Sequence, residues 1–454
     1  MGKTETNRIL MLEAPVGTTL ARLTVPMIFG ILSMVLYNLA DTFFVGQLGK
    51  EQLAALSFTF PVVMIIGSLS QGIGMGAAAA VSRAIGGQDY HRVRRLSTDS
   101  LILGLLIISV GVAVGLLTVE PLFSLLGATG AALDYVGEYM RIWYVGMIFV
   151  VVPMIGNNVL RATGDTKTPG LIMVLGAVAN FLLDPLLIFG LGPIPTLGVR
   201  GAAIATLIGR GITFLISMYA LVLREKLLTA EIPRLREVWL SWREILHVGL
   251  PNAGAKMIIP LGQGVIIRVV ASHGAAAVAG YGVATRVEFF SLAALYALSS
   301  VIGPFVGQNL GAGKLDRVRA GFAVSRHFSF SVGLGLFFVY LFLAGGVAAL
   351  FNEDPIVVST AALYIRIVSL AYAAQGFLLV VSAGLNVLKH PFHATGLSIL
   401  ELFGLAIPLV LLGSHFFGVT GIFAAIGISY LITGGVAWFV IERVLVRYEY
   451  RRFR

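Results

Sequence analysis

Cysteine is absent from the 454 residues of the sequence. Disulfide bonds, zinc sites with thiolate ligands and cysteine nucleophiles are therefore excluded. Charged side chains are also scarce, at 12% of the residues, whereas soluble domains contain roughly 25%. This shortage argues against a water-soluble enzyme, a nucleic-acid-binding domain and a disordered chain. Hydrophobic residues make up 57% of the sequence and occur in long blocks, so lipid is expected to surround most of the chain.

The apolar blocks are long enough to cross a membrane, because a spanning helix needs about 20 mostly apolar residues. Twelve blocks qualify, which predicts an all-α integral membrane protein with twelve transmembrane helices. Lys and Arg gather in alternate connections and in both termini, whereas the other connections hold only Lys50 and Arg200. Basic residues favour the cytoplasmic side, so a multi-pass protein of the cell membrane with both termini in the cytoplasm is expected.

The two halves of the sequence repeat one pattern. An offset of 225 residues relates Pro26 to Pro251 and Arg92-Val93-Arg94 to Arg317-Val318-Arg319. Six spans in each half make these parallel repeats, a plan typical of transporters with a substrate cavity between two lobes. A channel or a passive scaffold is the alternative. The predicted parts are an N-terminal six-helix lobe (1–222), a cytoplasmic linker (223–243), a C-terminal six-helix lobe (244–441) and a basic cytoplasmic tail (442–454).

Two aspartates lie inside apolar blocks, where a charge is costly and is usually functional. Asp41 is late in the first span and Asp184 late in the fifth, each a turn or two from the outer end. Asn180 precedes Asp184 by four residues and shares its helix face, and Thr206 enters at a similar level in the sixth span. The four side chains are predicted to converge and to hold either Na⁺ or a proton, since two close carboxylates repel each other. The alternative is that Asp184 caps a break at Pro185 and Asp41 faces an outer vestibule.

Other polar positions accompany this predicted site. Tyr37 and Asn38 precede Asp41 by four and three residues, so they share its helix face. Pro26 lacks a backbone donor and can kink the first span, although a proline in the first turn of a helix is also common. The sequence is therefore consistent both with a hinge at Pro26 and with an ordinary proline in the first turn of the helix.

The second half lacks the aspartate pattern. Ile266 and Gly404 occupy the equivalent positions. Arg286 and Glu288 do not share a helix face, so their partners are expected on other helices. Glu401 is expected to pair with an arginine, and the alternative is a second carboxylate for a proton or the substrate. The charges within the apolar blocks of this half are Lys256, Arg268, Arg286, Glu288, Arg366 and Glu401.

Several segments carry a resemblance to a known family. They are LYNLADTFFVGQLG, LRATGDTKTP, ANFLLDPLLIFGLG and GVRGAAIAT. Together they resemble the multidrug and toxic compound extrusion (MATE) family, and most closely its DinF-like branch. The resemblance implies two six-helix lobes and antiport, in which an organic cation or drug leaves as H⁺ or Na⁺ enters. It also implies small-molecule and lipid partners, a monomer, no enzymatic activity, no cofactor and no nucleic acid.

The resemblance also assigns roles to residues. Pro26 matches a proline at which the helix bends when the site is protonated. The implied ion or proton site consists of Asp41, Asn180, Asp184, Thr206 and the carbonyl of Ala202. The predicted polar lining of the cavity is Tyr37, Asn38, Tyr139 and Asn157. A lipid-linked oligosaccharide flippase of the same superfold is the alternative function, and an intramembrane enzyme is disfavoured because no HExxH or GxSxG motif occurs.

Overall fold

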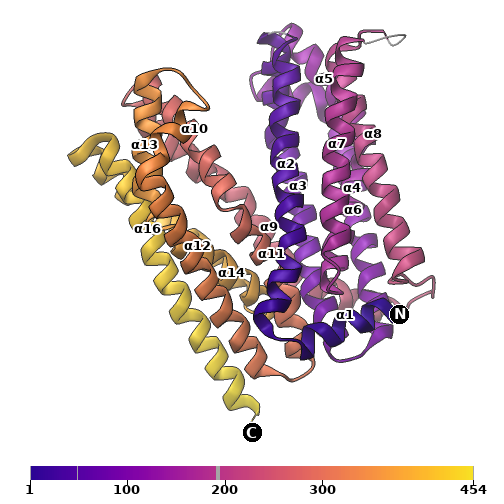
Figure 1. Ribbon diagram of the computed structural model, residues 1–454. Helices are drawn as coiled ribbons and strands as arrows, with labels where there is room; N and C mark the ends of the chain where they lie inside the picture. The colour runs from indigo at the N-terminus through magenta and orange to yellow at the C-terminus, as the bar shows by residue number, and fades with distance from the viewer. Residues whose placement is uncertain (1, 49, 191–194, 453–454) are drawn as a thin grey trace. The chain divides into compact units, whose positions relative to one another are not determined.

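A computed structural model describes residues 2–48, 50–190 and 195–452, with all side chains in these ranges except 2–3, 38–39, 41–42, 46, 50–56 and 451–452. The described residues are almost entirely helical (Figure 1). The first helices are α1 (Gly2–Glu13), α2 (Val16–Gly46), α3 (Lys50–Gly86), α4 (Tyr90–Leu125), α5 (Ala131–Val145), α6 (Met147–Ala162), α7 (Lys167–Phe189), α8 (Gly198–Met218) and the π-helical η1 (Tyr219–Arg224). They are followed by α9 (Leu235–Ala271), α10 (Ala275–Ser291), α11 (Ala293–Gly311), α12 (Leu315–Ala349), α13 (Pro355–Ser369), α14 (Tyr372–Val387), α15 (Pro391–Ile399), the π-helical η2 (Leu400–Ala406) and α16 (Ile407–Arg452).

The apolar blocks fold as helices because lipid offers no partner to a backbone N–H or C=O group. Within the described residues, eight helical segments are long and apolar enough to span a membrane. Three bent pairs would each add one span, with bends of 51° between α5 and α6, 47° between α10 and α11, and 61° between α13 and α14. The last segment, Pro391–Tyr450, is broken at Gly418, which has φ 58° and ψ −141°. Counted with this break, the helices agree with the twelve predicted spans.

The backbone repeats with the offset found in the sequence. Helix α6 runs from residue 147 to 162, and α14 runs from 372 to 387, which is 225 residues later at both ends. Each of these helices also follows a bend, after α5 in the first half and after α13 in the second. The predicted duplication is therefore present in the helices as well as in single matched residues.

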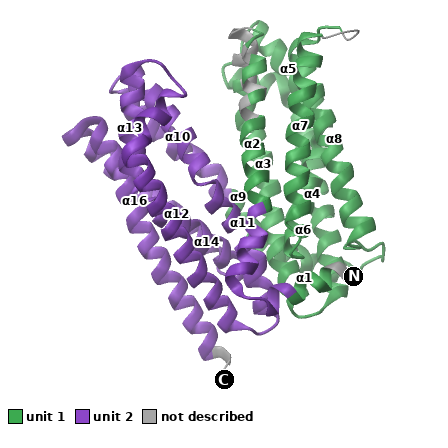
Figure 2. Cartoon of the chain, in the orientation of Figure 1, with its two compact units in different colours: residues 1–9, 26–253 green, residues 10–25, 254–454 purple. Residues whose placement is uncertain are grey.

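The chain forms two compact units, which divide it in an unexpected place (Figure 2). Unit 1 contains residues 1–9 and 26–253, and unit 2 contains residues 10–25 and 254–454. The boundaries fall at Pro26 and three residues after Pro251, the two prolines that the repeat pairs. Helices α2 and α9 are thus each shared between the units. The lobe boundaries at 222 and 244 remain a prediction, because they were defined by counting spans and not by compactness.

Each unit incorporates a segment that the sequence would assign to the other half. In unit 1, the first part of α9 packs closely on α3, since a Cβ atom on Gly249 would lie 2.8 Å from the carbonyl oxygen of Gly72. Small residues allow such close helix packing in membranes. In unit 2, Arg317 donates hydrogen bonds to the carbonyl oxygens of Met11 at 3.0 Å and Ala14 at 2.7 Å.

Candidate functional site

The predicted ion site is built around the packing of α7 against α8. A Cβ atom on Gly176 of α7 would lie 2.6 Å from the Thr213 side chain, and one on Gly209 of α8 would lie 3.7 Å from the Cβ of Asn180. Glycines on both helices therefore bring the two backbones together. This close approach places the polar residues of α7 directly beside α8.

A small apolar cluster fixes the level at which three helices meet. It consists of Val45 on α2, Ile188 on α7 and Ala202 on α8, all at most 1% exposed. Asp184 precedes Ile188 by four residues, and Thr206 follows Ala202 by four, so both lie one turn from the cluster on helices of opposite direction. Asp184 and Thr206 thus lie at a similar level, whereas the convergence of all four predicted side chains stays a prediction. Asp41 precedes Val45 by four residues, but its side chain lies outside the described residues, as does that of Asn38.

The buried polar groups of this site are only partly hydrogen-bonded. Asn180 donates to an oxygen of Asp184 at 3.2 Å, and the two residues are 1% and 0% exposed. The amide oxygen of Asn180 and the hydroxyl of Thr206, which is 7% exposed, have no hydrogen-bond partner among the described residues. Buried polar atoms are normally paired, so these oxygens are available to a ligand. Carboxylate, amide and hydroxyl oxygens suit a hard cation.

The predicted cavity residues lie on three helices of unit 1. Tyr37 is on α2, Tyr139 on α5 and Asn157 on α6. Tyr139 is 6% exposed, and the amide oxygen of Asn157 is buried without a hydrogen-bond partner among the described residues. Their role in binding remains a prediction.

Arg210 was not identified from the sequence, although it stands beside the predicted cavity. It follows Thr206 by one turn of α8, and its guanidinium carbon lies 5.3 Å from the ring centroid of Tyr37. The sequence could have indicated it, because it is a single arginine near the middle of an apolar span of 27 residues, Gly198–Arg224. An intramembrane ionisable residue indicates a functional site by default.

Pro26 lies within α2, where α7 packs closely on it. A Cβ atom on Gly170 would lie 2.6 Å from the Pro26 carbonyl oxygen, and one on Gly30 would lie 3.1 Å from the Gly170 Cα. The hinge at Pro26 stays a prediction, but the absence of side chains at Gly30 and Gly170 leaves the backbone of α2 close to that of α7 at Pro26 and one turn after it.

Unit 2 contains a separate buried carboxylate. Glu288 on α10 is 8% exposed and accepts hydrogen bonds from the hydroxyls of Tyr364 on α13 and of Tyr430 on α16, the latter at 3.1 Å. Glu401 accepts a hydrogen bond from Gln375 at 3.3 Å. The hydrogen-bond partner of Glu401 is thus an amide, and the prediction of an arginine as its partner was wrong.

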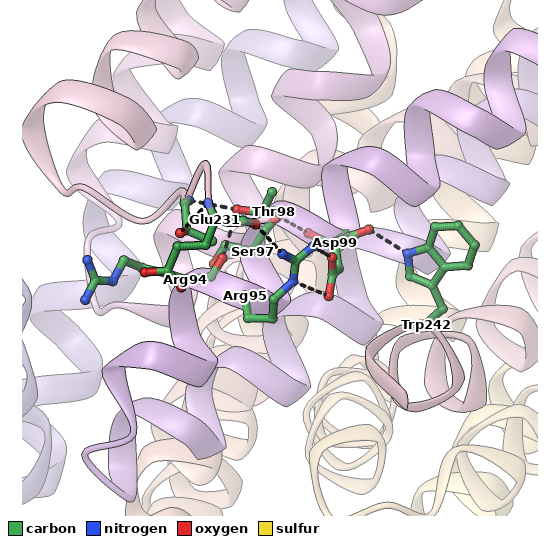
Figure 3. A network of polar contacts seen from close by, with 9 residues as sticks. Arg94, Arg95, Ser97, Thr98, Asp99, Glu231 and Trp242 are labelled. Atoms are coloured by element: carbon green, nitrogen blue, oxygen red, sulfur yellow. Dashed lines mark hydrogen bonds and ion pairs between the residues drawn. The ribbon is translucent and has the colours of Figure 1, made fainter. Parts of the chain in front are cut away.

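A further polar network lies at the start of α4 (Figure 3). Arg95 pairs with the buried Asp99 one turn later, with Nε and Oδ2 2.9 Å apart, and also donates to the carbonyl oxygen of Glu231 at 3.2 Å. Trp242 donates from its indole nitrogen to the backbone oxygen of Asp99 at 3.0 Å. Residues 225–234, in the predicted linker, are not helical, and this network holds them against α4.

These features define a class of protein: a membrane transporter of duplicated helical bundles with polar groups buried inside its spans. Residues 26–186 and 251–412 each match the MatE family model. The two matches begin at Pro26 and Pro251, the residues related by the repeat. The chain therefore belongs to the MATE family.

Individual relatives cover nearly the whole chain. The FAD transporter of Shewanella oneidensis is 38% identical over 437 residues, which cover 96% of each chain. The multidrug export protein MepA of Staphylococcus haemolyticus is 25% identical, with 94% of each chain covered. The crystal structure of the Vibrio cholerae MATE transporter VcmN in its bent form matches with a TM-score of 0.90 at 29% identity, covering 98% of this chain and 99% of that one.

Family membership confirms several predictions from the sequence. The protein is a multi-pass membrane transporter for small molecules and not an enzyme. Its two-lobe, twelve-span fold is that of the solved MATE transporters. Assignment to the DinF-like branch remains a prediction.

Proposed function

We propose that the protein is a secondary active exporter in which entry of H⁺ or Na⁺ through the N-terminal lobe drives the exit of a small organic molecule. The observation that carries this proposal is the buried pair of Asn180 and Asp184 beside Thr206, where two oxygen atoms have no partner among the described residues. A fully buried carboxylate is costly unless it is protonated or binds a cation. Loading of this site therefore changes the stability of the surrounding helices.

The coupling of ion entry to substrate exit follows from the free-energy cost of this buried carboxylate. Asp41 and Asp184, with Asn180, Thr206 and the carbonyl of Ala202, form the proposed ion site. When the site is loaded, the balance between a straight and a bent α2 shifts, with Pro26 as the hinge. Substrate bound in the same lobe is then displaced outward. Such a ligand shifts the equilibrium only through its different affinity for the two states.

Two substrate classes have support. Organic cations and drugs follow from the multidrug export proteins among the relatives, such as MepA at 25% identity. Flavin adenine dinucleotide follows from the FAD transporter at 38% identity and from Arg210, which places a positive charge beside Tyr37. The scheme needs no cofactor, because the ion gradient supplies the energy. We propose that the protein works as a monomer in the cell membrane, with both termini in the cytoplasm.

Transport into or out of proteoliposomes tests this proposal. A pH gradient and a Na⁺ gradient are imposed separately, and movement of ethidium and of FAD is followed by fluorescence. Asp184→Asn and Asp41→Asn remove a charge but keep the shape, so gradient-driven transport should be lost in both variants. The exposed Asp134 provides the matched control, and Asp134→Asn should transport like the wild type.

Two results would contradict the proposal. One is wild-type transport by Asp184→Asn and Asp41→Asn, inserted at normal levels, under both gradients. The other is an absence of ethidium and FAD transport by the wild type under either gradient, together with movement of a polyprenyl-pyrophosphate oligosaccharide between leaflets. That second result would support the flippase.

A further inference from the structure

We propose that Arg210 and Tyr37 form an anchor for an anionic aromatic substrate, with the guanidinium binding a phosphate and the tyrosine ring contacting a planar ring system. This inference rests on the proposed function as an exporter and specifies which charge its substrate carries. It concerns the chemistry of one lobe and is independent of the choice between H⁺ and Na⁺.

The position of Arg210 is the first argument. It lies near the middle of the span Gly198–Arg224, far from either interface, so its side chain cannot reach the headgroups as terminal arginines do. A cation at this depth is costly. It is retained where it faces a polar or water-filled cavity, and Arg210 is indeed only half-buried within unit 1.

The surroundings of Arg210 are the second argument. Among the described residues its guanidinium has no hydrogen-bond or ion-pair partner and stacks on the ring face of Tyr37, with its carbon 5.3 Å from the ring centroid. When the flat face of a guanidinium stacks on a ring, the N–H donors along its edge can still form paired hydrogen bonds with two oxygens of a phosphate.

Neighbouring polar atoms complete the site. The hydroxyl of Thr206, one turn before Arg210, and the amide oxygen of Asn180, which packs beside Gly209, are both buried without a partner among the described residues. A hydroxyl can donate to a phosphate or a ribose oxygen, and an amide oxygen can accept from a ribose hydroxyl or a ring N–H. A nucleotide-like molecule offers all of these groups, and an organic cation does not offer an acceptor for Arg210.

Binding and transport together test the anchor. FAD, the uncharged riboflavin and the cation ethidium serve as probes, with wild type, Arg210→Gln and Arg210→Lys, in detergent for binding and in proteoliposomes for transport. Arg210→Gln should weaken FAD binding about tenfold or more, because a hydrogen bond to a charged group is lost, and should slow FAD transport. Ethidium binding and transport should not be weakened, because a cation offers no acceptor to Arg210 and is repelled by its charge. Arg210→Lys keeps the charge but loses the paired hydrogen bonds of the guanidinium, so its affinity for FAD should lie between those of the wild type and Arg210→Gln.

Arg200 provides a matched control, since it lies on the same helix in an exposed pair with Glu138. Arg200→Gln should bind and transport all three probes like the wild type. The anchor is refuted if the wild type does not bind FAD more tightly than riboflavin, or if Arg210→Gln weakens FAD and ethidium equally. Ethidium transport without any FAD binding by the wild type refutes the anchor and leaves the exporter intact. Absence of all gradient-driven transport refutes the exporter, while the binding comparison still decides on the anchor.

Discussion

Removal of the Asp99 carboxylate should destabilise unit 1 by a predictable amount. Asp99 is fully buried, and the side chain of its partner Arg95 is 9% exposed. Breaking a buried ion pair from one side costs about 3–5 kcal/mol, because the remaining charge has no partner. Arg95 still donates to the carbonyl oxygen of Glu231 at 3.2 Å, so we expect the lower end for Asp99→Ala, about 3 kcal/mol. At about 2–4 °C per kcal/mol for a domain of this size, Tm should fall by about 6–12 °C.

Thermal unfolding of the purified protein in detergent, followed by tryptophan fluorescence, measures this change. Trp242 is a local reporter because its indole bonds to the backbone of Asp99. Glu120→Ala is the control: its ion pair with Arg141 is exposed, with side-chain exposures of 72% and 64%, and such pairs contribute about 0–1 kcal/mol. The double variant Arg95→Leu, Asp99→Leu should recover part of the stability, because no uncompensated charge remains. The reasoning is refuted if Asp99→Ala unfolds at the wild-type temperature, or if the double variant is less stable than Asp99→Ala.

Three further predictions concern other helix contacts. Gly170→Val should lower stability by about 1–3 kcal/mol, because even its Cβ would lie 2.6 Å from the Pro26 carbonyl oxygen; an unchanged Tm would contradict this packing. Pro26→Ala should slow gradient-driven transport without lowering Tm, because alanine allows an uninterrupted helix; a wild-type transport rate would argue against the hinge. Glu288→Ala should lower Tm by leaving the hydroxyls of the buried Tyr364 and the half-buried Tyr430 without their acceptor, at about 1–3 kcal/mol each, whereas Glu288→Gln should keep much of the stability. Equal Tm values for these two variants would show that the hydrogen bonds contribute little.

The sequence predicts the membrane fold well, because lipid imposes long apolar helices and the repeat shows how they are grouped. It also predicts that Asn180 and Asp184 share one helix face, because they are four residues apart, and the structure joins them by a hydrogen bond. The division of the chain at Pro26 could not be predicted, since it depends on which surfaces pack together after the helices form.

Contacts between distant segments account for the hydrogen-bond partners that the sequence did not identify. Glu288 bonds to tyrosines 76 and 142 residues further along the chain, and no local pattern indicates such partners. The mistaken expectation of an arginine for Glu401 has the same origin, because Gln375 reaches it from another helix. Arg210 differs, because its position inside an apolar span was visible in the sequence and its stacking on Tyr37 was not.

The exchange of segments between the units has a consequence for how the molecule can be assembled. A gene cut within residues 225–234 would yield two fragments that each contain one copy of the repeat, yet neither fragment would contain a whole unit. The first would lack the part of α9 up to residue 253, which packs on α3 in unit 1, and the second would lack residues 10–25, which Arg317 holds in unit 2. The ancestral duplication thus produced two halves that resemble a domain-swapped dimer joined into one polypeptide. Each half needs a segment of the other half to complete its unit, so the two halves are expected to fold together and not independently.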